Sequence, residues 1–150
     1  MQEAIRLARA SVRSGKGGPF GAVVVKRGKV IARGANVVTS DNDPTAHAEV
    51  EAIRAACRRL KTFSLHGCEL YASCEPCPMC LAAIYWARLD RVFYAATRKD
   101  AARAGFDDEL LYRELPLSPS RRKLAMKQLM RASALAAFSD WKRKADKVAY

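Results

Sequence analysis

Two short motifs constrain this 150-residue chain more than any other feature of its sequence. The first, H-A-E at 47–49, begins a stretch in which apolar residues such as Val50 and Ile53 recur with helical spacing. The second, P-C-P-M-C at 76–80, places a proline directly before another helical stretch. Histidine and cysteine are common zinc ligands, so the two helix starts must meet if both motifs serve one metal site.

The residue spacing explains how these motifs would hold and use a metal. Cys77 and Cys80 lie three residues apart in a first helical turn, so both sulfurs face one side, where the helix N-terminus favours thiolates. His47 presents a neutral nitrogen. These three ligands leave the fourth position of zinc for water, whose pKa the metal lowers to supply hydroxide as a nucleophile. Glu49 points elsewhere than His47 and is placed to act as a proton shuttle.

The combined pattern H-x-E…P-C-x-x-C is the signature of zinc deaminases of nucleobases. A structural zinc site would instead need a fourth protein ligand. Cys74 extends the pattern to C-x2-C-x2-C, which resembles an iron–sulfur run, although its nearby fourth cysteine is missing. We therefore expect Cys74 to be a strand-end thiol near the site, Cys57 and Cys68 to be core residues, and His66 to lie on the surface.

Hydrophobic periodicity predicts the order α-β-β-α-β-α-β for the first two-thirds of the chain. The predicted elements are a helix over 2–14, strands over 20–25 and 29–33, a loop over 39–45, a helix over 46–60, a strand over 68–73, a helix over 77–88 and a strand over 91–95. This order predicts a three-layer α/β/α sandwich around one mixed sheet.

The pattern is weaker after residue 96. We expect one or two short helices over 100–114, a strand or a helix over 124–130, and a helix over 131–145. The sequence contains no internal repeat and no low-complexity linker, so residues 1–150 are predicted to form a single domain. Within it, residues 1–118 would be the catalytic core and 119–150 a basic C-terminal segment.

The charge is strongly uneven along the chain. The net charge is +12 and the isoelectric point about 9.9, values that often accompany nucleic-acid binding. Residues 1–118, which hold every expected metal ligand, contribute only +5, whereas residues 119–150 contribute +7. We therefore assign the high isoelectric point to a basic tail and expect no nucleic-acid partner.

The sequence also predicts the compartment. It has no run of 18 apolar residues, and its first ten residues, M-Q-E-A-I-R-L-A-R-A, lack the apolar core of a secretory signal. An odd number of cysteines, five in all, fits a reducing cytosol. We expect a cytoplasmic protein with no membrane partner.

Several stretches closely resemble bacterial guanine deaminases of the cytidine-deaminase fold. The resemblance runs from about residue 15 to about residue 114. It rests on G-G-P-F-G-A-V (17–23), N-D-P-T-A-H-A-E-V (42–50), S-C-E-P-C-P-M-C (73–80), A-I-Y-W-A-R (83–88), V-F-Y-A-A (92–96) and A-G-F-D-D (104–108). The zinc motif marks only the superfamily, and the sharper markers are A-I-Y-W-A-R, A-G-F-D-D and the final Tyr150.

This resemblance implies hydrolysis of guanine to xanthine and ammonia at C2. It implies that His47, Cys77 and Cys80 hold one zinc ion per subunit and that Glu49 shuttles protons. The product of such an enzyme belongs to purine catabolism or salvage.

The resemblance also implies residues that bind the base. Asn36 matches an asparagine that hydrogen-bonds the base, and Phe20 and Trp86 match aromatic residues that line the pocket. Asp108 matches a carboxylate that recognises the N–H edge of the purine, with Asp107 as the second choice. Each has a plainer alternative: the two aromatics suit a core, Asn36 a turn and Asp108 a helix cap.

In the family that this sequence resembles, the C-terminal segment crosses to the partner subunit of a swapped homodimer. Tyr150 would then cap the partner's site in trans. The resemblance is thin beyond residue 114, and the basic runs R-R-K at 121–123 and K-R-K at 142–144 have no catalytic meaning that the sequence reveals.

Two alternatives lie within the superfamily. The +12 charge favours a tRNA adenosine deaminase, which must bind phosphates, and a guanosine deaminase would differ only in tolerating the ribose. A third alternative belongs to another class, a nucleic-acid-binding module whose zinc is structural and closed by four protein ligands.

Overall fold

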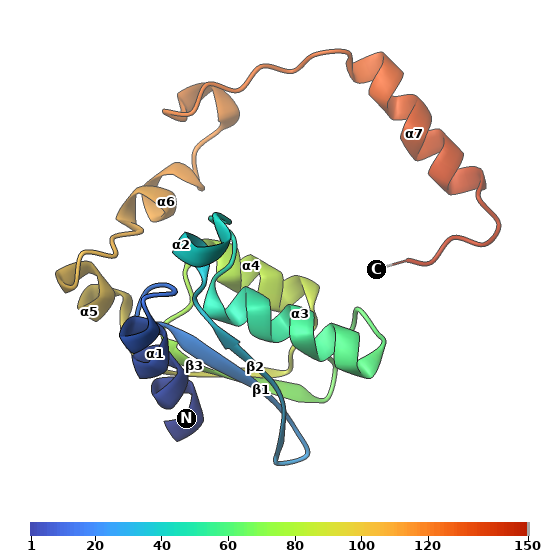
Figure 1. Cartoon of the computed structure of the whole chain (residues 1–150). Coiled ribbons are helices and arrows are strands. Elements are labelled where there is room, and N and C mark those ends of the chain that lie inside the picture. The colour runs from blue at the N-terminus through green and yellow to red at the C-terminus, as the bar shows by residue number, and fades with distance from the viewer. Residues whose placement is uncertain (150) are drawn as a thin grey trace. The chain divides into compact units, whose positions relative to one another are not determined.

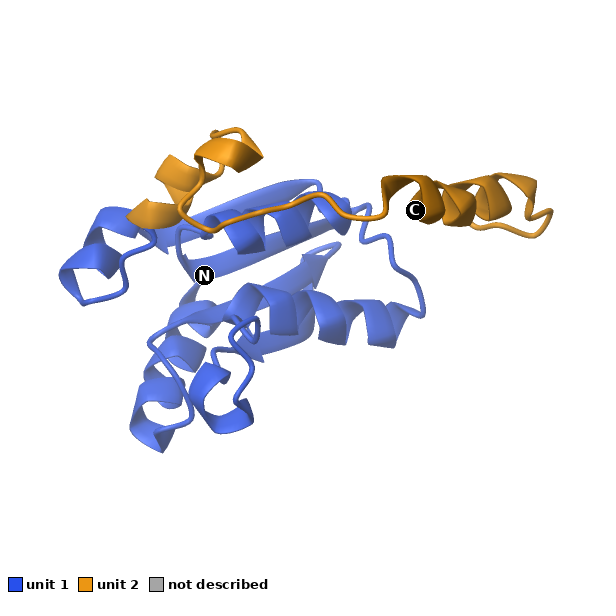
Figure 2. Cartoon of the chain, turned by 90° about the horizontal axis from the view of Figure 1, so that it is seen from above, with its two compact units in different colours: residues 1–108 blue, residues 109–150 orange. Residues whose placement is uncertain are grey.

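The computed structural model describes residues 1–149, so the expectation for Tyr150 lies outside the described residues. The chain divides into two compact units, residues 1–108 and 109–150, which are coloured separately in Figure 2. The second unit contains the basic segment 119–150 together with residues 109–118. No helix in the described part of the chain is long and apolar enough to cross a membrane.

A four-stranded mixed sheet organises the first unit (Figure 1). Its strands are β1 (Gly21–Lys26), β2 (Lys29–Ala35), β3 (Cys68–Cys74) and β4 (Arg91–Ala96), in the spatial order β2-β1-β3-β4. Strand β1 pairs antiparallel with β2 and with β3, and β3 pairs parallel with β4. Arg27 and Gly28 both have positive φ, as the tight turn between β1 and β2 requires. The predicted mixed sheet is confirmed.

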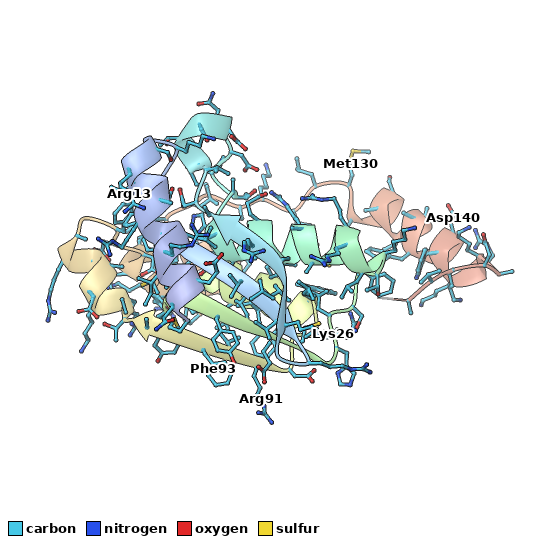
Figure 3. All side chains as sticks on the ribbon, turned by 60° about the horizontal axis from the view of Figure 1, so that its bottom comes forward. Arg13, Lys26, Arg91, Phe93, Met130 and Asp140 are labelled. Atoms are coloured by element: carbon cyan, nitrogen blue, oxygen red, sulfur yellow. The ribbon has the colours of Figure 1, made fainter. Side chains whose placement is uncertain are left out.

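Helix α1 (Gln2–Ser14) packs on one face of this sheet. The approach is so close that a Cβ on Gly21 would lie 2.3 Å from the Ala4 carbonyl oxygen. Only glycine fits there, which explains why the first strand begins with one. Figure 3 shows Arg91 and Phe93 projecting from β4, and the Phe93 ring stacks on Tyr71 of β3 with 4.7 Å between centroids.

Helix α3 (Ala48–Leu60) covers the opposite face, and α4 (Pro78–Trp86) packs beside it. A Cβ on Gly34 would lie 2.1 Å from the Ala48 carbonyl oxygen. Glycine at this position therefore allows α3 to approach the sheet closely, as Gly21 does for α1. Gly34 pairs with Ala22, the residue after Gly21, and neighbouring strand residues face opposite sides. Helices therefore lie on both faces, as the α/β/α prediction required.

Between α3 and the sheet lies the hydrophobic core. It is built from small and branched side chains, which allow the close helix approach: Ala22, Val24, Ala32, Ala48, Ala52, Ile53, Ala56, Leu65, Cys68, Leu70, Ile84 and Ala87. The prediction of core positions for Cys68, which is fully buried, and Cys57, which packs against this cluster, is confirmed. His66 is exposed as predicted and pairs with Asp90 at 2.9 Å.

Two local predictions were wrong. Part of the loop expected at 39–45 is helical, because α2 spans Val38–Asp41. Residues 124–130 form neither the strand nor the helix that was expected. Leu124, Leu129 and Met130 are each at least 70% exposed, so no apolar packing stabilises either element there.

The remaining elements that the structure describes are helical. The expectation of short helices over 100–114 is confirmed by α5 (Arg98–Arg103) in the first unit and α6 (Glu109–Glu114) in the second. A 3-10 turn, η1, spans Pro119–Arg121, and α7 (Arg131–Arg143) confirms the last predicted helix.

Candidate active site

Three side chains with metal-ligating atoms meet where α3 and α4 begin. His47 is the N-cap of α3 and Cys77 the N-cap of α4, with Cys80 in the first turn of α4. The ligand atoms of the three residues all lie within 4.8 Å of one another. The predicted convergence of the two motifs is therefore present in the structure.

The distances within this group fit tetrahedral zinc. The His47 Nδ1 atom lies 3.6 Å from the Cys77 sulfur and 3.5 Å from the Cys80 sulfur. Zinc bonds of about 2.3 Å to sulfur and 2.0–2.1 Å to nitrogen, set at a tetrahedral angle, separate those atoms by about 3.5 Å. The side chains thus already hold the spacing that the ion needs.

The protonation of the group also suits a cation. A hydrogen bond from the Cys80 thiol, together with one from His47, lowers the pKa of Cys77 to about 4 although burial opposes it. The same hydrogen bond, followed by burial, raises the pKa of Cys80. The pKa of His47 is raised, mainly by its hydrogen bond to Cys77. A divalent cation would replace these shared protons and balance two thiolates.

Cys74 lies close to this group but does not belong to it. It is the last residue of β3, it is buried, and its thiol donates to the Thr97 carbonyl oxygen at 3.5 Å. Burial raises its pKa to about 11, which keeps the thiol protonated. Among the described residues, the metal-ligating cluster contains one histidine and two cysteines, so neither an iron–sulfur run nor a fourth protein ligand for zinc is present.

Glu49 is the buried acid beside the ligands. It lies in the first turn of α3, two residues after His47, and its exposed fraction is 7%. Burial is the main cause that raises its pKa, and the Cys77 thiolate raises it further. The raised pKa lets this buried carboxyl group take up a proton more readily than an exposed carboxylate would.

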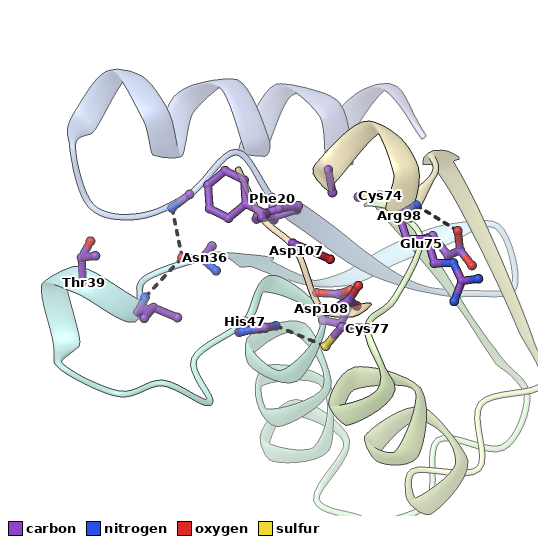
Figure 4. Close-up of a pocket in the computed structure, with 15 residues that line it drawn as sticks. Phe20, Asn36, Thr39, His47, Cys74, Glu75, Cys77, Arg98, Asp107 and Asp108 are labelled. Carbon is purple, nitrogen blue, oxygen red and sulfur yellow. Dashed lines mark hydrogen bonds between the residues drawn. The ribbon is translucent and has the colours of Figure 1, made fainter. Parts of the chain in front are cut away.

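A cavity of about 320 Å³ opens over these residues (Figure 4), a size typical of small-molecule sites. All the lining residues belong to the first unit. They are Gly18, Phe20, Asn36, Val38, Thr39, His47, Glu49, Cys74, Glu75, Cys77, Arg98, Ala101, Phe106, Asp107 and Asp108.

Asn36 is 6% exposed and has a defined orientation. Its side-chain oxygen accepts hydrogen bonds from the backbone N–H of Gly18 at 3.0 Å and of Val38 at 3.3 Å. The amide NH₂ is therefore the part left to donate to a ligand in the cavity. Glycine at position 17 leaves room for Asn36 in this place, since a Cβ there would lie 2.2 Å from the Asn36 carbonyl oxygen.

The aromatic wall differs from the expectation. Phe20 lines the cavity as predicted, but its partner is Phe106, whose ring meets it edge-to-face with 5.0 Å between centroids. Trp86, by contrast, is the last residue of α4 and is 65% exposed. It is not among the residues that line this cavity, so the structure of the single chain does not place it where the resemblance implied. Phe106 was missed, although it lies inside the A-G-F-D-D motif that the resemblance had singled out.

Asp108 and Asp107 both line the cavity. The pKa of Asp108 is raised, chiefly by burial. Sequence reasoning also missed Arg98 and Glu75, which reach the cavity from α5 and from the loop after β3. Neither residue belongs to a metal-ligand pattern, so no spacing rule could select them.

Comparison with known proteins gives one consistent result. Residues 1–96 match the family model described as the cytidine and deoxycytidylate deaminase zinc-binding region. The chain is 52% identical to a guanine deaminase from Bacillus subtilis over 150 residues, which cover all of this chain and 96% of that protein. The crystal structure of that guanine deaminase superposes with a TM-score of 0.97 and covers 99% of this chain and 95% of its own.

Two further relatives are more distant. A tRNA-specific adenosine deaminase from Aquifex aeolicus is 44% identical over 99 residues, which are 66% of this chain and 65% of that protein. The structure of a guanine deaminase from Nitrosomonas europaea has a TM-score of 0.67 at 36% identity and covers 71% of this chain and 62% of its own. The metal-binding core is thus shared widely, while the full-length likeness is to a guanine deaminase.

Proposed function

The chain belongs to the cytidine and deoxycytidylate deaminase family, and on that premise we propose that it is a zinc-dependent hydrolase that converts guanine to xanthine and ammonia. The observation that carries the choice of substrate is the 52% identity to a guanine deaminase along the entire chain. The zinc ligands alone would not make that choice, because the wider superfamily shares them.

The reaction is a hydrolysis and needs no oxidant. The oxygen of water bonds to C2 of guanine, the bond from C2 to the amino nitrogen breaks, and C2 becomes a carbonyl. His47, Cys77 and Cys80 would hold zinc, which activates water as a nucleophile because a bound cation lowers the pKa of water.

Glu49 moves the protons. Its buried carboxylate accepts a proton from water and delivers it to N3 of the ring, then carries the second proton to the departing amine. Burial raises its pKa, which favours the protonated form that would act as an acid in the second half of the reaction. Its place in the first turn of α3 keeps the carboxyl group beside the ligands and within the cavity wall.

The base would be recognised by side chains outside the ligand group. The free NH₂ of Asn36 donates to an acceptor of guanine, and Phe20 provides an aromatic wall. The Asp108 carboxylate accepts an N–H of the purine. Phe106 joins this set because its ring completes the wall that Phe20 begins.

The proposal includes a homodimer in the cytoplasm with an exchanged C-terminal segment. Helix α4 exposes Leu81, Tyr85 and Trp86, and α7 exposes Phe138 and Trp141. Apolar side chains of this size are typical of surfaces that pair with another protein. Tyr150 would act in the partner's site.

A mixed dimer tests this exchange. One subunit would carry Glu49→Gln, and the other would lack Tyr150. Each homodimer is expected to be inactive, whereas the mixed dimer should recover about half the activity, because one site then has both residues. Full activity of the protein that lacks Tyr150, or no recovery in the mixed dimer, would contradict the exchange.

A turnover panel tests the activity itself. Zinc-loaded protein would be incubated with guanine, guanosine, adenine, cytosine and a tRNA stem-loop, and the release of ammonia would be measured. We expect turnover of guanine. Deamination of the stem-loop without that of guanine would instead indicate a tRNA adenosine deaminase. Turnover of guanosine alone would indicate a guanosine deaminase.

A further inference from the structure

The direction of the Asn36 side chain depends on how its own main chain is held. Asn36 follows the last residue of β2, and its backbone N–H donates to the Phe20 carbonyl oxygen at 3.0 Å. Its side-chain oxygen accepts hydrogen bonds from the backbone N–H groups of Gly18 and Val38, which are drawn as dashed lines in Figure 4. A shift of this short stretch of backbone would therefore turn the NH₂ group that faces the cavity.

A buried serine of α1 contacts the backbone carbonyl of Asn36. The Ser11 hydroxyl donates to that carbonyl oxygen at 2.9 Å. Ser11 is 4% exposed and Asn36 6%, so water has little access to the bond. The buried residues of α1 are Ala4, Ala8 and Ser11, which places a hydroxyl on a face that is otherwise apolar. A polar group buried in such a place is expected to have a specific partner, and here the partner is Asn36.

The peptide group between Asn36 and Val37 is held at both ends. Its carbonyl oxygen accepts from Ser11, and its N–H donates to the Ala46 carbonyl oxygen at 3.1 Å. Without the Ser11 hydroxyl, a buried carbonyl would lose this donor and the peptide would keep only the contact at its N–H. Because a peptide group is planar, a tilt at the carbonyl moves the Asn36 Cα as well, and the side chain moves with it.

We propose that Ser11 is a positioning residue that directs the amide of Asn36 toward the base. The inference rests on the proposed function, in which Asn36 donates to guanine, and adds a residue of α1 that is not among those lining the cavity. Ser11 acts through Asn36 and takes no part in metal binding or proton transfer. Loss of its hydroxyl therefore weakens binding of the base and leaves the chemical step unchanged.

Graded removal of the donor gives the first test. In Ser11→Ala we expect KM for guanine to rise about tenfold, because a binding group is displaced, while kcat and the zinc content stay unchanged. Ser11→Cys fills nearly the same space with a weaker donor and should give an intermediate KM. Unchanged KM values in both variants would overturn the inference. Should Ser11→Ala fail to fold, a raised KM in Ser11→Cys supports the inference and an unaltered KM overturns it.

The matched control is Ser14→Ala, which removes a hydroxyl from the last residue of the same helix. The Ser14 hydroxyl donates to the Ser11 carbonyl oxygen at 3.0 Å, within α1, and Ser14 is exposed. This change leaves the bond to Asn36 in place, so KM for guanine should equal that of the unaltered protein. An equal rise in KM for Ser14→Ala and Ser11→Ala would indicate a general effect of altering α1 and would overturn the role of Ser11.

A double-mutant cycle separates positioning from stability. Asn36→Ala removes the amide but keeps the backbone carbonyl that Ser11 contacts. Adding Ser11→Ala to Asn36→Ala should lower stability in urea unfolding as much as it does alone. It should raise KM, or the Kd for guanine where turnover is too slow to measure, by less than about twofold.

The outcomes of this cycle distinguish the inference from the proposed function. A full additional rise in KM in the Asn36→Ala background would overturn the inference, while guanine turnover by the unaltered protein left the proposed function standing. Absence of guanine turnover in the unaltered protein would overturn both.

Discussion

The ligand group and the segment 98–108 contribute to the same cavity but are built in different ways. His47 and Cys77 are helix N-caps, and Cys80 and Glu49 are buried in first helical turns. Most of segment 98–108, by contrast, is exposed, and Phe106 keeps 43% of its surface accessible. Regular elements hold the expected metal ligands and Glu49, while a short surface segment supplies the groups that we propose select the base.

This difference has a physical basis. Proton transfer and metal binding need ligand positions held to a fraction of an ångström, which packed helices provide. Recognition of a base requires acceptors and an aromatic wall at an opening through which the base can enter. Backbone contacts such as that of the Phe106 N–H with the Ala101 carbonyl, 3.0 Å long, give the segment its shape without covering it.

The largest expected effect belongs to Glu49, the buried acid beside the ligand group. Glu49→Gln keeps the size of the side chain but removes the proton shuttle, so kcat for guanine should fall about 10³-fold, within the range of general acid–base catalysis. Zinc content, measured by atomic absorption, should stay at that of the unaltered protein. Retained activity in zinc-replete Glu49→Gln would show that the chemistry is not carried by this residue.

A smaller effect is expected from Asp108→Asn in the segment 98–108. Loss of a hydrogen bond to a charged group costs about 1.5–3 kcal/mol, so kcat/KM should fall about 10- to 100-fold, and the change should lie in KM. Steady-state kinetics with guanine would measure it. A fall in kcat with KM unchanged would remove the distinction between the two parts of the site.

The smallest effect concerns the aromatic wall. Phe106→Ala and Phe93→Ala each break one aromatic pair, with Phe20 and with Tyr71, and each should lower stability by about 1 kcal/mol in urea unfolding. Only Phe106 lines the cavity, so only its loss should raise KM, by about three- to tenfold. Equal KM values for the two variants would show that Phe106 takes no part in binding the base.

The same difference explains what could be predicted from the sequence. The spacing of His47, Cys77 and Cys80 predicted a metal group because helix starts give those positions fixed directions, and the alternation of short apolar runs predicted the mixed sheet. Phe106 and Arg98 were missed because a loop that turns at Gly105 has no periodicity that relates sequence position to direction. Residues 124–130 were predicted wrongly because an apolar pattern forms an element only where a surface packs against it.

The position of Trp86 could not be predicted either, although it lies within a helix. Its motif, A-I-Y-W-A-R, is mostly apolar, yet α4 buries Ile84 and leaves Tyr85 and Trp86 exposed. An apolar helix shows no polar face from which its buried side could be inferred, so the sequence could not tell that its aromatic residues would stay exposed and outside the cavity lining.

Titration of zinc into chelated protein, with ammonia release from guanine as the readout, tests the central claim most directly. Three protein ligands in each chain predict that activity rises linearly and saturates at one zinc ion per chain. Guanine turnover that persists in the chelated protein, or that is absent at one equivalent of zinc, would contradict the account.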